Sequence, residues 1–291
     1  MSFRTRFAPS PTGPLHLGHA FSAMTAHDMA RQKRGTFLLR MDDIDRERSK
    51  PAWEALAFED LRWLGLTWPE PVLRQSSSAP HFERALATLA AKDLLYPCSC
   101  TRADIENAAS APQEGVPTHG PDGRIYPGTC RGRAMSSRLP GDALRLDMAR
   151  AIESVARLPK FTETGAEKQG RHRLKADDLL TTIGDPVISR RGGGIAYHLA
   201  VIVDDAAQQI THVVRGMDLF EATRIHVLLQ TLLDLPTPIY HHHRLIRDGD
   251  GKRLAKRDDA RALRKFREEG YTPADVRRMV GLELSTGIPP V

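Results

Sequence analysis

The sequence predicts an α/β protein built around a parallel β-sheet, interrupted by an insertion and closed by a short helical C-terminus. A strand, a helix and a second strand are expected within residues 3–41, and this order favours parallel pairing. Residues 97–140 are rich in Pro, Gly, Ser and Arg, lack the apolar residues of a core and hold all three cysteines. The length of 291 residues suits two domains, or one large α/β domain with an insertion.

Turn residues and apolar spacing define the first strand–helix–strand unit. Arg4 to Phe7 is a short strand candidate, and residues 8–14 are turn-forming residues. A helical pattern covers residues 18–33, with Gly35 as the expected C-cap. Residues 37–41 are then expected to form a buried strand, which is followed by an acidic run.

The spacing of apolar residues also predicts the remaining elements, because it differs between a helix and a strand. The expected elements are, in order, helices over 51–64 and 79–95, strands over 186–189 and 195–203, a helix over 219–234, a strand and a basic loop over 239–256, and a helical stretch over 260–280.

The composition is that of a soluble globular protein, with 41% hydrophobic and 27% charged residues. Lys and Arg number 42 against 36 Asp and Glu, and the net charge of +6 permits a polyanionic partner. No stretch approaches the roughly 20 apolar residues that span a bilayer. The N-terminus also lacks the apolar run of a signal peptide. We therefore expect a cytoplasmic protein without a membrane partner.

The first candidate site lies where the first strand ends and the first helix begins. Ligands of parallel sheets bind beyond the carboxyl ends of the strands, close to the free N–H groups of helix N-termini. The sequence there is His16-Leu17-Gly18-His19, in which Gly18 would let a ligand approach the backbone and both imidazoles could stabilise a phosphate. The alternative is a helix start with two solvated histidines. Neither a dinucleotide-binding glycine motif nor a P-loop motif is present.

The second candidate is the basic loop Lys252-Arg253-Leu254-Ala255-Lys256-Arg257, which follows a glycine-containing run. Its cations could close over a triphosphate. The alternative is an ordinary solvated, charged surface.

The cysteines Cys98, Cys100 and Cys130 form the third candidate site. An odd number in one segment does not suit a disulfide framework and favours a metal site. Zinc takes four ligands, and either Tyr126 or His119 could be the fourth. The alternative is three free thiols in a loop.

The run His241-His242-His243 looks like a metal-binding tract. In a strand, however, alternate residues face opposite sides, so the three side chains could not easily bind one ion. We expect them to be strand residues close to the basic loop.

Taken together, the first two candidates resemble the two signature motifs of class I aminoacyl-tRNA synthetases, His-Ile-Gly-His and Lys-Met-Ser-Lys-Ser, in the same order. The flanking runs resemble the glutamyl branch of that family and comprise residues 6–13, 40–45, 196–205 and 214–219. When residues 6–19 are counted as one motif, five separated motifs in family order over residues 4–257 make coincidence implausible. The resemblance implies the Rossmann-like parallel sheet of this class.

Length and cysteine spacing indicate a particular branch. Only about 34 residues follow Arg257, too few for the helical domain that reads the anticodon in glutamyl-tRNA synthetases. Cys98-Ser99-Cys100, followed by Tyr126 four residues before Cys130, resembles the zinc site of a truncated paralogous family, the glutamyl-Q tRNA(Asp) synthetases. This resemblance favours Tyr126 over His119 as the fourth ligand.

The resemblance implies ATP-dependent, tRNA-independent activation of L-glutamate, followed by its transfer to the queuosine base at the wobble position of tRNA(Asp). The expected cofactors are one structural Zn²⁺ per chain and Mg²⁺ bound with ATP. We expect a monomer. One alternative is a truncated glutamyl-tRNA synthetase that charges a tRNA 3′ end, and another is an inactive paralogue that only binds RNA.

The same resemblance divides the chain into four segments. These are the first half of the catalytic domain (1–96), a zinc-binding, acceptor-like insertion (97–180), the second half with the nucleotide loop (181–257), and a short helical extension without an anticodon-binding domain (258–291).

The site residues also follow from the resemblance. The glutamate-binding residues are Arg6, Phe7, Ala8, Pro9, Ser10, Asp42, Tyr197 and Arg215; the ATP-binding residues are His16, Gly18, His19 and Lys256; the metal ligands are Cys98, Cys100, Tyr126 and Cys130. Among them, His16, His19 and Lys256 are the expected catalytic residues.

Glutamate carries two carboxylates and an ammonium group, which calls for cations and an acid. Arg6 is the expected partner of one carboxylate, Arg215 a bidentate partner of the other, and Asp42 the partner of the ammonium group. Tyr197 is expected to form a hydrogen bond with the substrate. The sequence departs from the family at Asp42, where Glu is usual. It also has Arg253-Leu254-Ala255-Lys256 where the family has Lys-Leu-Ser-Lys.

The substitution Lys256→Ala is expected to lower glutamate-dependent ATP–pyrophosphate exchange by at least about tenfold, because it removes a cation that stabilises charge on the phosphates. An exchange rate equal to that of the unaltered protein would exclude Lys256 from the site.

Overall fold

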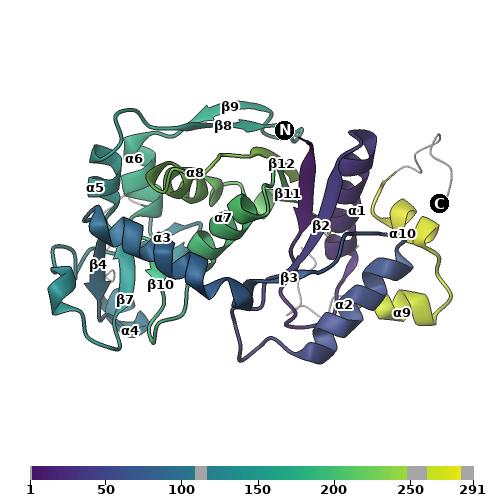
Figure 1. Ribbon diagram of the computed structural model, residues 1–291, viewed down its shortest axis with the longest axis horizontal. Coiled ribbons are helices and arrows are strands. Elements are labelled where there is room, and N and C mark those ends of the chain that lie inside the picture. Colours follow the sequence, from purple (N-terminus) through teal and green to yellow (C-terminus); the bar gives the residue numbers. More distant parts are fainter. Residues whose placement is uncertain (1, 109–116, 248–260, 283–291) are drawn as a thin grey trace.

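The computed structural model describes residues 2–108, 117–247 and 261–282. Figure 1 shows two parts side by side along the longest axis. One part contains the first sheet with α1 and α2, and the other contains most of the remaining helices and strands. Over the described ranges, no helix is long and apolar enough to cross a membrane.

The first sheet is parallel, as predicted. Its strands β1 (Arg4–Phe7), β2 (Thr36–Met41) and β3 (Leu73–Arg74) lie in that order. Helix α1 (Leu17–Gln32) packs on this sheet, and the residues it places in the core shared with the sheet are four alanines and Met24. The small side chains let the helix approach the strands closely. Helix α2 (Pro51–Trp63) contributes Leu61 to the same core.

The turn between α1 and β2 differs from the prediction for Gly35. The residue with left-handed backbone geometry is Arg34, with φ 51°. Gly35 is needed for space instead, because a Cβ there would lie 2.2 Å from the carbonyl oxygen of Phe3. The missing side chain therefore lets the end of α1 close against the start of β1.

The second sheet continues beside the first. Its order is β11 (His212–Gly216), β12 (Ile239–His243), β8 (Lys160–Glu163) and β9 (Gly170–Arg173). Strands β11, β12 and β8 run parallel to one another, whereas β9 is antiparallel to β8. Just before β11, the N–H of Thr211 donates to the carbonyl of Arg4 at 3.0 Å, which places β11 beside β1. The carboxyl ends of β1 and β11 therefore lie close together.

The strand predicted over residues 195–203 is wrong, because this region forms helix α7 (Tyr197–Ala207). All residues from His198 to Asp205 are buried, so no polar face interrupts the apolar run. A short, continuous apolar run fits a buried strand and a buried helix equally well. The strand predicted just before it is present as β10 (Val187–Ser189).

An antiparallel sheet links the insertion to α7. Its order is β10, β7 (Ala143–Leu146) and β4 (Leu95–Cys98). The sheet therefore draws strands from both sides of the boundary expected near residue 180. The described residues between β4 and β7 form the short helix α4 (Arg102–Ala108), the hairpin of β5 (His119–Gly120) and β6 (Gly123–Arg124), and a single 3₁₀ turn over residues 135–137. This confirms the irregular character predicted for the segment.

The second core lies between this antiparallel sheet, α7 and two further helices. These are α3 (Ala79–Ala91) and α8 (Thr223–Leu232), and α5 (Met148–Glu153) packs at its edge. The helices predicted over 79–95 and 219–234 are thus present but shorter. The short helix α6 (Ala176–Asp178) continues into a π-helical turn over residues 179–183.

The single helical stretch predicted over 260–280 is divided in two. Helix α9 (Leu263–Glu268) ends before Gly270, which has φ 83°. Helix α10 (Pro273–Met279) then begins with Thr272 as its N-cap, whose side chain accepts from the N–H of Asp275. A glycine followed by a capped start ends one helix and begins another.

The two turn residues respond oppositely to substitution. Gly35→Ala is expected to lower the free energy of unfolding by about 2 kcal/mol, because the new methyl group meets the backbone of Phe3. Arg34→Gly is expected to raise it by up to about 1 kcal/mol, because it removes a side chain from left-handed geometry. Urea unfolding followed by circular dichroism measures both. A Gly35→Ala variant at least as stable as the Arg34→Gly variant would contradict this account.

Candidate active site

A cavity of about 330 Å³ lies at the carboxyl ends of β1 and β11 and the N-terminus of α1. It brings together residues that are far apart in the sequence. The predicted residues that line it are Arg6, Phe7, Ala8, Ser10, His16, Gly18, His19, Asp42, Tyr197 and Arg215. Pro9 contributes its backbone instead, since its carbonyl accepts from the N–H of Asp42 at 3.1 Å. Lys256 and the rest of the predicted basic loop lie outside the described residues.

The two histidines close the N-terminus of α1. His16 is the N-cap, and its Nδ1 accepts from the N–H of Gly18 at 3.1 Å. Nδ1 of His19 accepts from the N–H of His16 at 3.1 Å, and the two ring centroids are 3.8 Å apart. Each ring in its neutral form therefore carries its proton on Nε2.

Gly18 has a local role that the sequence did not indicate. A Cβ at this position would lie 3.0 Å from Cε1 of His16. The glycine therefore makes room for the capping imidazole as well as for a ligand.

A buried group of charges supports the floor of the cavity. Arg40 is fully buried, and it donates through Nε to Oδ1 of Asp42 and through Nη1 to Oδ1 of Asp205, both at 2.7 Å. Oδ2 of Asp204 lies 4.0 Å from Nε of Arg40. Paired carboxylates raise the pKa of Arg40, although burial opposes this shift. The carboxyl ends of β2 and α7 are thereby joined by ion pairs.

Arg6 is held at one edge and open at another. Its Nε and Nη2 donate to the two carboxylate oxygens of Asp205 at 3.0 and 3.2 Å, and Nη1 donates to the carbonyl of Val214 at 3.4 Å. A guanidinium carries five N–H groups, so within the described residues one on each terminal nitrogen remains for a ligand. Arg6 can therefore offer a two-pronged contact to a carboxylate.

Asp42 can accept a cation from the cavity. It is 7% exposed, and burial raises the pKa of its carboxyl even though Arg40 and Arg6 oppose that shift. An ammonium group bound in the cavity would favour the charged carboxylate. Oδ1 already accepts from Arg40, so Oδ2 is the oxygen that can serve a ligand.

Arg215 is anchored on several sides by neutral groups. Nε donates to Nε2 of His242 at 3.0 Å, and Nη1 lies 3.1 Å from Nδ1 of His226. Nη2 donates to the carbonyl of Leu219 at 3.2 Å and to the hydroxyl of Thr223 at 2.7 Å. Of the five N–H groups, these contacts in the described part of the chain leave one on Nη1 for a ligand. These anchors leave too few N–H groups for the bidentate contact predicted from the sequence, so we expect Arg215 to contact a ligand through a single N–H.

Tyr197 lies at the first position of α7 and lines the cavity. Its ring is 5.6 Å, centroid to centroid, from each of His198 and His226. The ring therefore packs edge-on against two imidazoles beside the cavity, and its hydrogen bond with a substrate stays a prediction.

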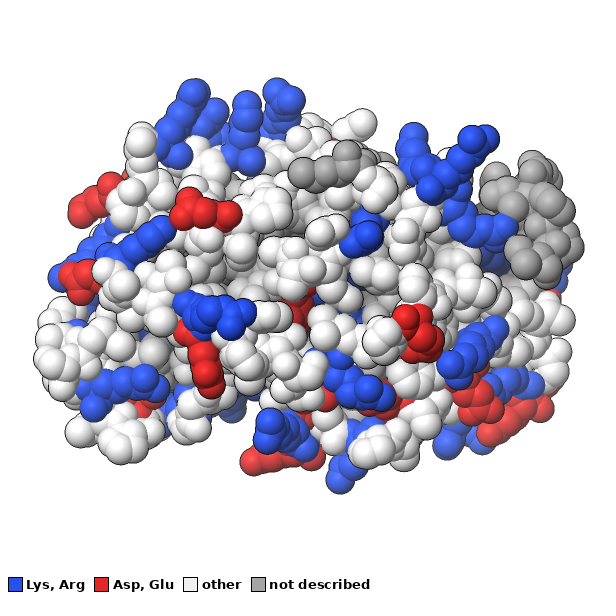
Figure 2. All heavy atoms as spheres, viewed as in Figure 1, with Lys and Arg blue, Asp and Glu red and all other residues white. Residues whose placement is uncertain are grey.

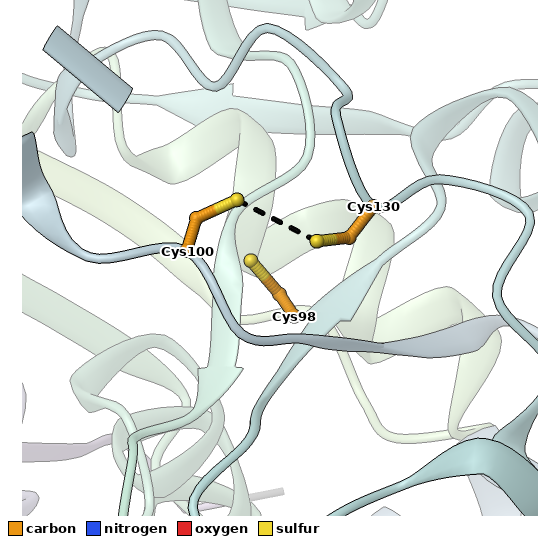
Figure 3. Close-up of side chains that lie close together, drawn as sticks. All are labelled: Cys98, Cys100 and Cys130. Carbon is orange, nitrogen blue, oxygen red and sulfur yellow. Dashed lines mark hydrogen bonds between the residues drawn. The ribbon is translucent and has the colours of Figure 1, made fainter. Parts of the chain in front are cut away.

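The three cysteines meet in a separate cluster within the insertion (Figure 3). Their sulfur atoms lie within 4.8 Å of one another, and Sγ of Cys100 is 3.5 Å from Sγ of Cys130. The hydroxyl of Tyr126 is 3.4 Å from the sulfurs of both Cys98 and Cys100. Ligand sulfurs around a tetrahedral zinc lie roughly 3.8 Å apart, given Zn–S bonds near 2.3 Å. The cluster is therefore of the size that zinc requires.

The surroundings of the cluster support Tyr126 over His119 as a fourth ligand. His119 is exposed, and its Nδ1 lies 3.0 Å from the hydroxyl of Thr118. The guanidinium of Arg145 lies 3.7 Å above the ring of Tyr126, and its Nε donates to Sγ of Cys98 at 3.3 Å. Burial raises the pKa of the Tyr126 hydroxyl, and the positive charge of Arg145 beside the cluster would compensate part of the negative charge that ligands of a metal carry.

Several residues behind the cavity were not predicted to act there. Asp205 lies in a motif that was identified without a role for this residue, and His242 lies in the histidine run that was interpreted as an ordinary strand. Glu163 and His226 carry no local sequence signal, because only the fold brings them to Arg215.

Comparison with known proteins agrees with this geometry. A family model described as the catalytic domain of class I tRNA synthetases (E and Q) matches residues 2–125 and 159–286. The glutamyl-Q tRNA(Asp) synthetase of Rhodobacter capsulatus is 58% identical over 281 residues, covering 96% of this chain and 99% of that protein. The protein of the same name from Nocardia farcinica is 42% identical over 98% of this chain and 85% of its own length.

Solved structures show the same fold. The glutamate tRNA ligase of Elizabethkingia meningosepticum, determined in complex with its amino acid, aligns with a TM-score of 0.76 and 27% identity over 99% of this chain. This chain spans only 62% of the length of that ligase. The family match covers most of the chain, and the chain therefore belongs to the class I tRNA synthetases for glutamate and glutamine and is a ligase of the aminoacyl-tRNA synthetase type.

Proposed function

We propose that this ligase activates L-glutamate with ATP, in the absence of tRNA, and transfers it to the queuosine base at the wobble position of tRNA(Asp). The observation that carries the proposal is the cavity in which Arg6, Arg215 and Asp42 face one space beside the histidines of α1. The charges of these groups complement the charges of glutamate.

Glutamate fits this cavity better than a neutral amino acid does. The two-pronged edge of Arg6 and the remaining N–H of Arg215 suit two carboxylates, and Oδ2 of Asp42 suits the ammonium group. An amino acid without a side-chain carboxylate would leave a buried guanidinium uncompensated, which is costly. The name of the solved glutamate tRNA ligase is consistent with this choice.

Activation is an in-line attack of the glutamate α-carboxylate on the α-phosphorus of ATP. The new bond joins a carboxylate oxygen to phosphorus, and the bond to the bridging oxygen breaks as pyrophosphate leaves. No protein nucleophile is needed, so the chain contributes position and charge stabilisation. The Nε2–H groups of His16 and His19 supply hydrogen bonds at the start of α1, and Mg²⁺ arriving with ATP supplies further charge. Lys256, outside the described residues, keeps its motif-based role.

In the transfer step, a nucleophile on the RNA attacks the activated carbonyl carbon and AMP leaves. The wobble base is favoured over a tRNA 3′ end because the relative from Rhodobacter capsulatus, which bears the glutamyl-Q name, matches over 99% of its length. Figure 2 shows Lys and Arg side chains along the edge that lies over β8 and β9. Exposed residues there include Lys160, Arg171 and Arg173, which can contact RNA phosphates.

Transfer of radiolabelled glutamate tests the proposal. The full chain with ATP and Mg²⁺ is expected to label tRNA(Asp) that carries queuosine, because the modified base supplies the acceptor. Unmodified tRNA(Asp) and tRNA(Glu) serve as matched controls and are expected to stay unlabelled. Label on the 3′ end of tRNA(Glu) would contradict the proposal and support the alternative of a truncated glutamyl-tRNA synthetase.

We also propose one structural zinc per chain, held by Cys98, Cys100, Tyr126 and Cys130. The geometry and the adjacent cation Arg145 support this assignment. Four protein ligands fill a tetrahedral ion, so its contribution is to the stability of an insertion that has little apolar core.

Elemental analysis of protein purified without added metal is expected to give about one zinc per chain. Cys98→Ser is expected to lose the zinc and to lower the melting temperature, because a thiolate ligand is removed. His119→Ala is the matched control. It is expected to keep the zinc and the melting temperature of the unaltered protein, since His119 lies outside the cluster. A purified protein without metal, together with an unchanged melting temperature in the Cys98→Ser variant, would exclude the site.

A further inference from the structure

Arg215 is part of a continuous row of buried polar side chains. On one side, His242 lies between Arg215 and Glu163, with its Nδ1 in hydrogen-bonding contact with Oε2 of that carboxylate. On the other side, Nε2 of His226 lies 3.0 Å from Nδ1 of His198. The four residues of this row other than Arg215 are each at most 5% exposed: Glu163, His198, His226 and His242. Sequence reasoning assigned no function to any of them.

The row ends in the insertion. Nε2 of His198 lies 3.3 Å from Oδ1 of Asp122. Asp122 is exposed and sits in the turn of the β5–β6 hairpin, four residues before the proposed zinc ligand Tyr126. The row therefore extends from the second sheet, through the cavity, to the segment that carries the cysteines.

Arg215 determines the direction of every hydrogen bond on the Glu163 side. A guanidinium can only donate, so Nε2 of His242 must accept. The proton of this imidazole then resides on Nδ1 and is donated to Glu163. The hydroxyl of Thr223 accepts from Nη2 of Arg215 and donates to the carbonyl of Leu219 at 3.2 Å, which leaves Nε2 of His242 to accept from Arg215.

The same rule determines the other side. Nδ1 of His226 must accept from Arg215, so its proton resides on Nε2 and is donated to Nδ1 of His198. The proton of His198 then resides on Nε2, which lies 3.3 Å from Oδ1 of Asp122. All three rings are neutral in this arrangement, and protonation of His242 or His226 would set two donors against each other. Burial lowers the pKa of both His242 and His226, and the nearby charge of Arg215 lowers them further.

We propose that Glu163, His242, His226 and His198 are positioning residues that hold Arg215 for the substrate carboxylate through one directional hydrogen-bonded chain, and that Asp122 connects this chain to the insertion. The inference rests on the proposed glutamate activation. Its consequence is electrostatic as well as geometric. The hydrogen-bonding partners of Arg215 in the described chain are two imidazoles, a hydroxyl and a carbonyl, and its guanidinium also lies 5.3 Å from the ring centroid of Tyr240. All of these groups are neutral, so the position of Arg215 is defined while its charge stays available to the substrate.

Glu163→Gln tests the direction of the chain with almost no change of shape. Oε1 of Glu163 accepts from the backbone N–H groups of His242 at 2.9 Å and Gly165 at 2.5 Å. The glutamine oxygen must take that place, so its NH₂ group faces Nδ1 of His242. The imidazole then has to carry its proton on Nε2, where it opposes the Nε–H of Arg215.

Two measurements follow. In histidine ¹⁵N NMR of the unaltered protein, His242 is expected to carry its proton on Nδ1, and His226 and His198 on Nε2. In the E163Q variant, His242 is expected to carry its proton on Nε2 instead. In ATP–pyrophosphate exchange, E163Q is expected to raise KM for glutamate by at least about tenfold, with kcat and KM for ATP changed by less than about threefold. A merely structural defect would not select the KM for glutamate.

Asp122 offers a test that leaves the core intact, because this side chain is exposed. Asp122→Ala is expected to raise KM for glutamate about twofold to threefold, since His198 loses its acceptor. Asp122→Asn keeps an oxygen for His198 and is the matched control, with an expected KM equal to that of the unaltered protein.

Different tautomers of these histidines in the unaltered protein would contradict the proposed row of hydrogen bonds. An unchanged KM for glutamate in both the E163Q and the D122A variants would also contradict it. Absence of glutamate-dependent exchange in the unaltered protein would instead contradict the proposed function. In that case the NMR result would still test the proposed row of hydrogen bonds, because the measurement requires no catalysis.

Discussion

The structure depends on the pairing of charges that are removed from water around Arg40. An unpaired guanidinium or carboxylate at this depth would cost several kcal/mol, so the elements that carry these groups must come together in one arrangement. Arg40, the penultimate residue of β2, donates to Asp42 and to Asp205 in the last turn of α7, and Asp205 in turn accepts from Arg6 of β1. The relative positions of β1, β2 and α7, which form the floor of the cavity, therefore follow from these ion pairs.

Two arginines serve the same cavity but are held in different ways. Arg6 is held by the carboxylate of Asp205, so part of its charge is compensated and, among the described contacts, two N–H groups remain for a ligand. Arg215 is held by neutral groups, so its charge is retained and a single N–H remains. One cation thus supplies geometry for a carboxylate and the other supplies electrostatic attraction. A pair of identical ion-paired arginines would provide less attraction for a substrate with two carboxylates.

The sequence predicted those parts of the molecule whose signals are local. The β1–α1–β2 unit and the lining residues from Arg6 to His19 follow from turn residues, apolar spacing and motifs that are short in sequence. Helix α7 was missed because burial on all sides removes the period that distinguishes a helix from a strand. Gly35 was given the wrong role for a similar reason, because a close approach to Phe3 is a property of the fold. His226 and Glu163 could not be found at all, since a neutral buried histidine has no signature before its partners are known.

The position of Asp122 bears on why an insertion with little core of its own is joined to a catalytic domain. A hairpin held only by loop contacts would allow Asp122 a wide range of positions. A carboxylate without a fixed position could not determine which ring nitrogen of His198 carries the proton. Tyr126, four residues after Asp122, lies against the sulfurs of Cys98 and Cys100, and this contact restricts the hairpin near its base. A metal in that cluster would therefore stabilise more than the insertion itself. By limiting where Asp122 can lie, it would also determine how firmly His198, His226 and finally Arg215 are held, which makes glutamate affinity a property that the insertion can influence from outside the cavity.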